Sequence, residues 1–413
     1  MNNRNSGSSR KSRSIFTRQI IVITFFRLLL NTTRRFVYPF APALSRELGV
    51  SLADVTSIIA ASQFTSLFGM FSGPVADRFG YRGMMRAGLA VLSAGMLLCG
   101  LVPTYWPVFV GLVLASFGKT IFDPAIQAYI GHYVPYERRG RAIGIVETAW
   151  SGSTLLGIPA LGLVIDHLGL VNSFYILALL GFLAWIGLGM VIPAEKTGGA
   201  RGEGAGLSTV FKQLISVRPA LGMLIFGFWI AIANDCLFVV YGSWFEQDFH
   251  VNIVTLGFTT VAIGIAELLG ESMTALFTDR LGPQRATFCG ICLVIAAYLL
   301  LPLIGRTLPL AMAGMFFIFF FFEFTIVSSF SLSSELIPEA RATMLAGFYA
   351  TSGVGRMIGV LVGVSLWQLA GVRGVAWFAA FFTVLGLFSL LWGLSGWQDK
   401  KGSTLQISGK QRL

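Results

Sequence analysis

The chain has 413 residues and a formal net charge of +11, yet only 12% of its residues are charged and 55% are hydrophobic. A soluble domain carries roughly 25% charged residues, so this chain cannot cover its surface with groups that suit water. The composition excludes a cytosolic enzyme, a disordered regulator and a nucleic-acid-binding domain. It predicts an all-α integral membrane protein whose surroundings are a lipid bilayer, with no nucleic acid as a partner.

The first 18 residues contain five basic residues and no acidic one, and they are rich in Ser and Asn. We predict a disordered cytoplasmic tail over residues 1–18. A signal peptide has an apolar run of about 7–15 residues, whereas the run here continues to about Leu44. A mitochondrial transit peptide shares this Arg- and Ser-rich composition and is the alternative.

Twelve apolar runs follow, each near or above the length of about 20 residues that a helix needs to cross a bilayer. They lie at 19–44, 54–76, 84–104, 106–133, 141–164, 171–193, 218–245, 253–278, 286–304, 309–334, 341–370 and 374–397. We predict an N-terminal six-helix bundle over 19–193, a cytoplasmic linker over 194–217, a C-terminal six-helix bundle over 218–397 and a cytoplasmic tail over 398–413.

Lys and Arg residues gather in alternate loops, in the linker and in both tails. The intervening loops contain only Arg46, Arg306 and Arg373. Basic residues are enriched on the cytoplasmic side of membrane proteins. The pattern therefore predicts that both termini are cytoplasmic.

The two halves repeat each other. Asp77-Arg78-Phe79-Gly80 follows the second run, and Asp279-Arg280-Leu281-Gly282 follows the eighth. Pro135-Tyr136-Glu137-Arg138 after the fourth run is echoed by Pro338-Glu339-Ala340-Arg341 after the tenth. Such repeats predict two pseudo-symmetric bundles around a central cavity.

The segment Gly73-Pro74-Val75-Ala76-Asp77-Arg78-Phe79-Gly80-Tyr81-Arg82 resembles the signature that the major facilitator superfamily carries between its second and third helices, roughly G-x-x-x-D-R-x-G-R-[RK]. Tyr81 replaces one basic position of the signature and Arg82 supplies the other. The resemblance implies a twelve-helix secondary transporter that is not an enzyme. It also implies conformational-switch loops made by Gly73, Asp77, Arg78, Gly80 and Arg82 and, in the second copy, by Asp279, Arg280 and Gly282.

The fifth run is similar to the G-x-x-x-G-P-x-x-G-G motif of proton-driven bacterial exporters. It contains Gly152, Gly157, Pro159 and Gly162, with the Pro one residue late and one Gly in place of the final pair. A Pro kink with small residues for helix packing explains the same pattern. The Arg that such exporters carry in the fourth helix is replaced by Leu114, which departs from their usual proton route.

Ionisable groups inside membrane spans cost about 2.5–3.5 kcal/mol each on insertion scales, so they are functional candidates. Arg27, Asn31, Arg34 and Tyr38 are spaced to share one helix face, which we expect to line a water-filled cavity. Arg35 points elsewhere, and we expect it to snorkel or to pair with a neighbouring helix.

The other candidates lie in the fourth, fifth, seventh, eighth, tenth and eleventh runs: Lys119, Asp123, Glu147, Asp235, Glu267, Glu271, Glu323 and Arg356. Lys119 and Asp123 are four residues apart and can pair. Asp235 falls near the repeat equivalent of Arg34 and is our candidate for a protonatable switch. Two carboxylates one turn apart, such as Glu267 and Glu271, repel each other, and Arg356 is the expected partner of Glu323. About half of these groups are expected to form structural ion pairs.

Cys289 and Cys292 form a C-x-x-C spacing with no His, Asp or Glu nearby, which we interpret as buried packing rather than metal or redox chemistry. No catalytic residue, metal or cofactor is expected.

These observations predict a monomeric transporter that moves a small organic molecule in exchange for protons. The resemblance implies that its location is the bacterial cytoplasmic (inner) membrane. The favoured direction is efflux of a drug-like or amphipathic metabolite. The alternative is proton-linked uptake of an organic anion, which Arg27, Arg34 and Arg356 would bind. A transporter-like membrane sensor or a membrane enzyme is a third, different class.

Overall fold

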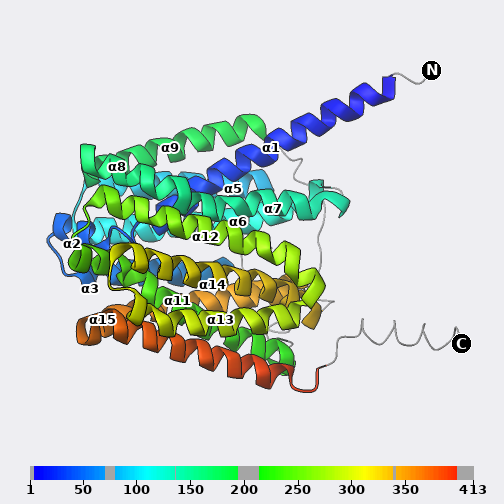
Figure 1. The fold of residues 1–413 in the computed structure, drawn as a ribbon. Coiled ribbons are helices and arrows are strands. Elements are labelled where there is room, and N and C mark those ends of the chain that lie inside the picture. Colours follow the sequence, from blue (N-terminus) through cyan, green and yellow to red (C-terminus); the bar gives the residue numbers. More distant parts are fainter. Residues whose placement is uncertain (1–3, 70–79, 135, 194–213, 338–340, 398–413) are drawn as a thin grey trace, which may run out of the picture.

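The computed structural model describes residues 4–69, 80–134, 136–193, 214–337 and 341–397. Within these ranges every regular element is helical. The helices run roughly along one direction, and helix α1 begins on the same side of the molecule on which α15 ends (Figure 1). We call this side the terminal side, and the opposite side, where α2 lies, the far side.

The first half of the chain forms α1 (Arg4–Arg35), α2 (Ala41–Leu48), α3 (Leu52–Phe64), the 3-10 turn η1 (Thr65–Phe68), α5 (Tyr81–Leu101), α6 (Tyr105–Tyr133), α7 (Tyr136–Gly152), the π-helical turn η2 (Ser153–Gly157), α8 (Ile158–Leu168) and α9 (Leu170–Val191). The second half forms α11 (Arg218–Phe249), α12 (Ile253–Leu281), α13 (Pro283–Ile304), α14 (Leu308–Leu336) and α15 (Arg341–Leu394).

The predicted spans correspond to these helices. In the described parts of the chain, nine helices are long and apolar enough to cross a membrane, or up to ten if the bent pair Ala41–Leu48 and Leu52–Phe68 is one span. One of the nine, Thr343–Leu394, contains two predicted spans that meet at a kink with φ 59° and ψ −159° at Gly371. Helix α1 contains most of the first predicted span. The arrangement is therefore that of a twelve-helix bundle.

The first span differs from the prediction at both ends. Helix α1 starts at Arg4, within the segment that composition predicted to be disordered, and it stops at Arg35 rather than near Leu44. A turn follows before α2 begins at Ala41. Pro39 explains the break, because proline lacks the N–H that a helix needs and its ring clashes with the preceding turn. Tyr38 consequently lies in the turn and not on the helix face that we predicted.

Contacts between the two halves involve few helices. Helix α12 packs against α7, η2 and α8, and α15 packs against α3 and η1. On the far side, Arg46 of α2 forms an ion pair of 2.5 Å with Glu246 of α11. Gly162 and Gly257 bring α8 and α12 close together there. The halves are thus joined on the far side and in the middle of the bundle.

Within the second half, α11 and α15 pack closely along a stripe of small residues, Gly355, Gly359 and Gly363. A Cβ atom at Gly359 would lie 2.6 Å from the carbonyl oxygen of Ile232. The two cysteines of the C-x-x-C spacing are exposed on α13, unlike Cys99 and Cys236, which are buried. The prediction that Cys289 and Cys292 are buried was therefore wrong, because α13 turns that face away from the bundle.

Gly359→Ala is expected to destabilise the folded protein by about 1–3 kcal/mol, since the added methyl group overpacks a backbone contact. The matched control is Gly144→Ala, because no heavy atom lies within 4 Å of a Cβ there. The melting temperature of the purified protein in detergent measures the effect. Equal melting temperatures for the two variants would contradict the packing described here.

Candidate functional site

Most of the ionisable candidates meet in the middle of the bundle, where the first and second halves of the chain face each other. Among the described residues, two of the polar contacts that cross this boundary lie at the centre of the site. One joins Arg35 to Glu267, and the other joins Tyr38 to Asp235.

The Arg35–Glu267 contact is a buried, bidentate ion pair. The two guanidinium nitrogens of Arg35 donate to the two carboxylate oxygens of Glu267 at 2.5 and 3.2 Å. The two side chains are only 4% and 2% exposed. Thr154, in the π-helical turn η2, donates a hydrogen bond of 2.7 Å to the same carboxylate. This geometry satisfies both charges, which is the condition for burying an ion pair at low cost.

A chain of hydrogen bonds forms the second crossing. Arg34 donates to the side-chain oxygen of Gln63, whose Nε2 donates to the Tyr38 hydroxyl at 2.7 Å. Tyr38 donates to Asp235 Oδ1 at 2.6 Å, and Asn234 donates to the other oxygen at 3.4 Å. Arg34 and Asp235, which occupy nearly equivalent positions of the two repeats, therefore do not pair directly. The broken helix after Arg35 lets the Tyr38 hydroxyl reach the carboxylate instead.

A third network lies entirely in the first half. Arg27 pairs with Asp123 at 3.1 Å and with Glu147 at 2.9 Å, and Lys119 pairs with Asp123. The Lys119–Asp123 prediction is confirmed. Arg27 and Asn31 are buried and donate to the carbonyl oxygens of Val146 and Ala149. These two side chains pack against α7, whereas Arg34 of the same predicted face is partly exposed and lines a small pocket. That the face lines a water-filled cavity stays a prediction.

The carboxyl groups of Glu271 and Glu323 take part in no ion pair with the described residues. The expected Glu323–Arg356 pair is thus absent from this part of the chain. Glu323 is nevertheless buried at 8% exposure, and the charges acting on it are those of Glu267, Glu271, Arg35 and Arg356. Glu271 lies one helical turn from Glu267 on α12.

Trp150, at the end of α7, is surrounded by cations. Arg35 lies 4.1 Å from the centre of its ring, Arg356 lies 5.7 Å away and Lys119 lies 6.0 Å away. Cations are attracted to the face of an indole ring. Cationic side chains from three helices, α1, α6 and α15, therefore lie around this one ring.

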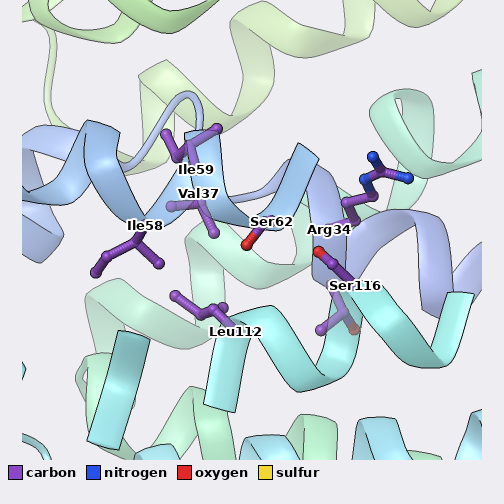
Figure 2. A pocket seen from close by; sticks show the side chains of 8 residues that line it. Arg34, Val37, Ile58, Ile59, Ser62, Leu112 and Ser116 are labelled. Atoms are coloured by element: carbon purple, nitrogen blue, oxygen red, sulfur yellow. The ribbon is translucent and has the colours of Figure 1, made fainter. Parts of the chain in front are cut away.

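A small pocket opens beside Arg34 in the first half. Its lining consists of Thr33, Arg34, Val37, Ile58, Ile59, Ser62, Leu112 and Ser116. Figure 2 shows Ile58, Val37 and Leu112 at one end and the Arg34 guanidinium pointing away from them. Half of the lining residues are polar or charged, and the charged end of Arg34 is directed away from the apolar end of the pocket.

The switch loops are described only in part. Gly73, Asp77 and Arg78 lie outside the described residues, and the structure does not describe the side chain of Asp279. Gly80 and Gly282 adopt almost the same backbone conformation, with φ 78° and 80° and ψ 147° and 146°. Each precedes a helix, so the two copies of the motif share their local geometry. Arg82 donates to the carbonyl oxygen of Gly189 at 2.5 Å, while Arg280 is exposed.

The predicted site residues did not include Gln63, Thr154 or Arg35, the last of which was expected to snorkel or to pair with a neighbouring helix. Gln63 was detectable as a long polar side chain within an apolar run. Thr154 lies in the Gly- and Pro-containing segment that resembles an exporter motif, and the structure forms a π-helical turn there. Such turns are frequent at functional sites, but their position cannot be read from composition.

Replacing Arg35 or Glu267 alone by Met is expected to destabilise the protein by about 3–5 kcal/mol, because either change leaves one buried charge without its partner. The double replacement is expected to recover most of this loss. The exposed Arg46–Glu246 pair is the control, with an expected effect of about 0–1 kcal/mol. For each pair, thermal unfolding of the parent, the two single variants and the double variant gives the interaction energy between the two side chains. If the losses from the single replacements at Arg35 and Glu267 simply added in the double variant, the pairing would be contradicted.

Known proteins place this fold in a family. The sequence model of the Major Facilitator Superfamily matches residues 22–244 and 223–412. The chain is 24% identical to the uncharacterized MFS-type transporter YceJ of Bacillus subtilis, over 88% of this chain and 93% of that protein. It is also 24% identical to the multidrug resistance protein MdtG of Klebsiella pneumoniae, over 85% and 89% of the two chains.

A solved structure supports the same fold. The inward-facing, unoccupied bacterial homologue of the human lysosomal transporter Spinster superposes with a TM-score of 0.70 at 15% identity, covering 92% of this chain and 96% of that one. The apolar helices and the family match together make this a multi-pass membrane protein that transports a small molecule and is not an enzyme. The chain belongs to the major facilitator superfamily.

Proposed function

We propose that this transporter exports a small organic molecule in exchange for protons, by alternating access, in a bacterial cytoplasmic membrane with both termini cytoplasmic. MdtG, a relative over most of the chain, is named a multidrug resistance protein, which supports the direction. The basic loops and tails support the orientation.

The Arg35–Glu267 ion pair carries the proposal. Alternating access requires the two halves to separate in turn on each side of the membrane. This pair joins the halves through two buried charged side chains, which are 4% and 2% exposed. Taking away one partner of a buried pair leaves the other charge uncompensated. A proton on Glu267 removes the carboxylate charge and so lowers the cost of separation.

Arg35 retains other contacts when Glu267 is neutralised. Its guanidinium donates to the carbonyl oxygen of Trp150 at 3.1 Å and stacks over the Trp150 ring. These partners belong to the first half and move with it. Arg35 can therefore remain in place while Glu267 leaves with the second half.

The surrounding charges favour a proton as the coupled ion. Glu267 and Glu271 lie one turn apart on α12, and Glu323 packs beside them, since a Cβ atom at Gly270 would lie 2.9 Å from the Glu323 Cβ. Among the described residues, the one ion pair of these three carboxyls is that of Glu267 with Arg35. Like charges this close in a low-dielectric site disfavour full ionisation. We infer that this group of three carboxyls takes up and releases the coupled protons, with Asp235 as a second site at the Tyr38 contact.

The Arg27, Lys119, Asp123 and Glu147 network is assigned a positioning role. It contains two basic and two acidic groups in mutual contact, so it needs no proton to be neutral. Asp123 and Glu147 are partly exposed, at 27% and 37% of their side chains, on the terminal side of the boundary. We infer that the described conformation is closed on the far side and accessible from the terminal side.

The two bundles are proposed to move as rigid bodies, 19–193 against 218–397, joined by the linker over 194–217. One chain contains both halves of the site, so the monomer is proposed as the working unit. The loops that carry Gly80 and Gly282 lie at equivalent positions in the two halves, where the proposed movement would require a switch.

Accumulation assays in an efflux-deficient bacterium test the direction. With the protein expressed, we expect lower accumulation of at least one compound from a panel of dyes, antibiotics and organic acids, and loss of this effect with a protonophore. Asp235→Asn is expected to abolish it, whereas Asp248→Asn, an exposed position on the same helix, is expected to leave it intact. Raised accumulation of an acid would instead indicate uptake.

Glu267→Gln is expected to separate coupling from transport. The neutral side chain can still hydrogen-bond to Arg35 but cannot exchange a proton, so uphill export in proteoliposomes should fall at least about tenfold, the size of a lost proton-transfer function. Exchange of labelled for unlabelled substrate without a gradient should persist. Glu47→Gln, at an exposed position on α2, is the control, and retention of uphill export in Glu267→Gln would reject the assignment.

A further inference from the structure

We propose that Arg34 and Arg356, one from each half of the molecule, hold an acidic group of the transported compound, so that the substrate is an organic anion such as an aromatic carboxylate. This inference rests on the proposed transport function and adds the chemical class of the substrate. It differs from the expectation for a general exporter of amphipathic compounds.

The first observation is that both guanidinium groups lack an ion pair. Among the residues that the structure describes, no carboxylate lies within 4.0 Å of Arg34 or Arg356. Arg27 and Arg35, by contrast, are each paired. Within the described ranges Arg34 donates only to the neutral amide of Gln63, which leaves most of its five N–H groups available.

The second observation is that the two groups approach the same buried carboxylate, Asp235, from opposite sides of the boundary. Arg34 is linked to Asp235 through Gln63 and Tyr38. Arg356 lies one helical turn from Gly359 on α15, where a Cβ atom would lie 3.2 Å from the Cβ of Asp235. Asp235 is already held by Tyr38 and Asn234 and is 1% exposed. One buried carboxylate therefore faces two cations, and an added anion would offset the repulsion between them.

The third observation concerns the shape and sign of the surroundings. Arg34 and Arg356 are partly exposed, so a ligand can reach them. Arg356 lies over the Trp150 ring, and the Tyr38 and Phe238 rings stack at 4.6 Å close to Asp235. Tyr38 and Phe238 are buried, so the partly exposed Trp150 ring is the surface that can accept a flat apolar body. The three cations around Trp150 disfavour a cationic one. Guanidinium forks bind carboxylates in a bidentate manner.

Binding to the purified full-length chain in lipid nanodiscs tests the inference. The probes are three acids, indole-3-acetate, naphthalene-1-acetate and benzoate, and their three primary amides. A ligand that binds the folded state raises the melting temperature in a saturable manner. We expect at least one acid to do so while its amide, which has the same shape without the charge, does not.

Variants of the two arginines then locate the site. Arg34→Gln and Arg356→Gln are each expected to weaken binding of that acid roughly tenfold or more, the loss of a charge-assisted bidentate contact. Arg34→Lys and Arg356→Lys keep the charge without the fork and are expected to bind with intermediate affinity. Arg306→Gln, at an exposed position, is the control. Size-exclusion elution and the melting temperature without ligand show that each variant is folded.

Three results would overturn the inference: none of the acids stabilises the protein, an acid and its amide stabilise it equally, or folded Arg34→Gln and Arg356→Gln bind the acid like the parent chain.

The transport assays keep this test separate from that of the proposed function. Arginine-dependent acid binding without proton-driven transport would reject antiport alone. Proton-driven export of uncharged or cationic compounds that is unchanged in Arg34→Gln would reject the anion site alone.

Discussion

A charge inside a bilayer is tolerated when a partner of opposite sign and further hydrogen bonds accompany it, and in this protein that constraint joins the two halves of the chain. Arg35 and Glu267 compensate each other at the centre of the boundary, and Thr154 completes the coordination of the carboxylate. Because the partners belong to different bundles, the interaction that stabilises one arrangement is also the one that any relative movement must break. The rest of the site is arranged around this pair.

Packing distributes the contacts between the halves unevenly. The Arg46–Glu246 pair and the close approach of α8 to α12 lie on the far side, and the polar crossings at Tyr38 and Arg35 lie in the middle. Toward the terminal side, Asp123, Glu147 and Tyr349 are exposed to different degrees. A transporter that alternates between two states needs such an asymmetry. In one state the two halves are in contact on one side of the membrane and apart on the other, and in the second state this is reversed.

The buried charged side chains form three groups that differ in their ratio of acidic to basic residues. The Arg27 network is neutral by itself, the region around Glu267 has an excess of carboxyl groups, and the region around Arg34 and Arg356 has an excess of guanidinium groups. Neutral groups suit structural support, whereas unbalanced ones need a mobile species to compensate them. The proposed proton compensates the excess of carboxyl groups, and the proposed anionic substrate compensates the excess of guanidinium groups. The two sites are linked because Arg35 and Arg356 both lie over the Trp150 ring.

The sequence by itself determined the twelve apolar spans, the internal repeat and the Lys119–Asp123 pair, because span length, repeated motifs and a four-residue spacing are local properties of the chain. It also identified most of the ionisable residues of the site. Tertiary structure alone decided which of them meet: Arg35 and Glu267 are separated by 232 residues and Tyr38 and Asp235 by 197. The break at Pro39 moved Tyr38 off the predicted helix face, so that its hydroxyl, and not Arg34, reached Asp235. Such long-range contacts depend on how two bundles pack, and no periodicity within either bundle encodes them.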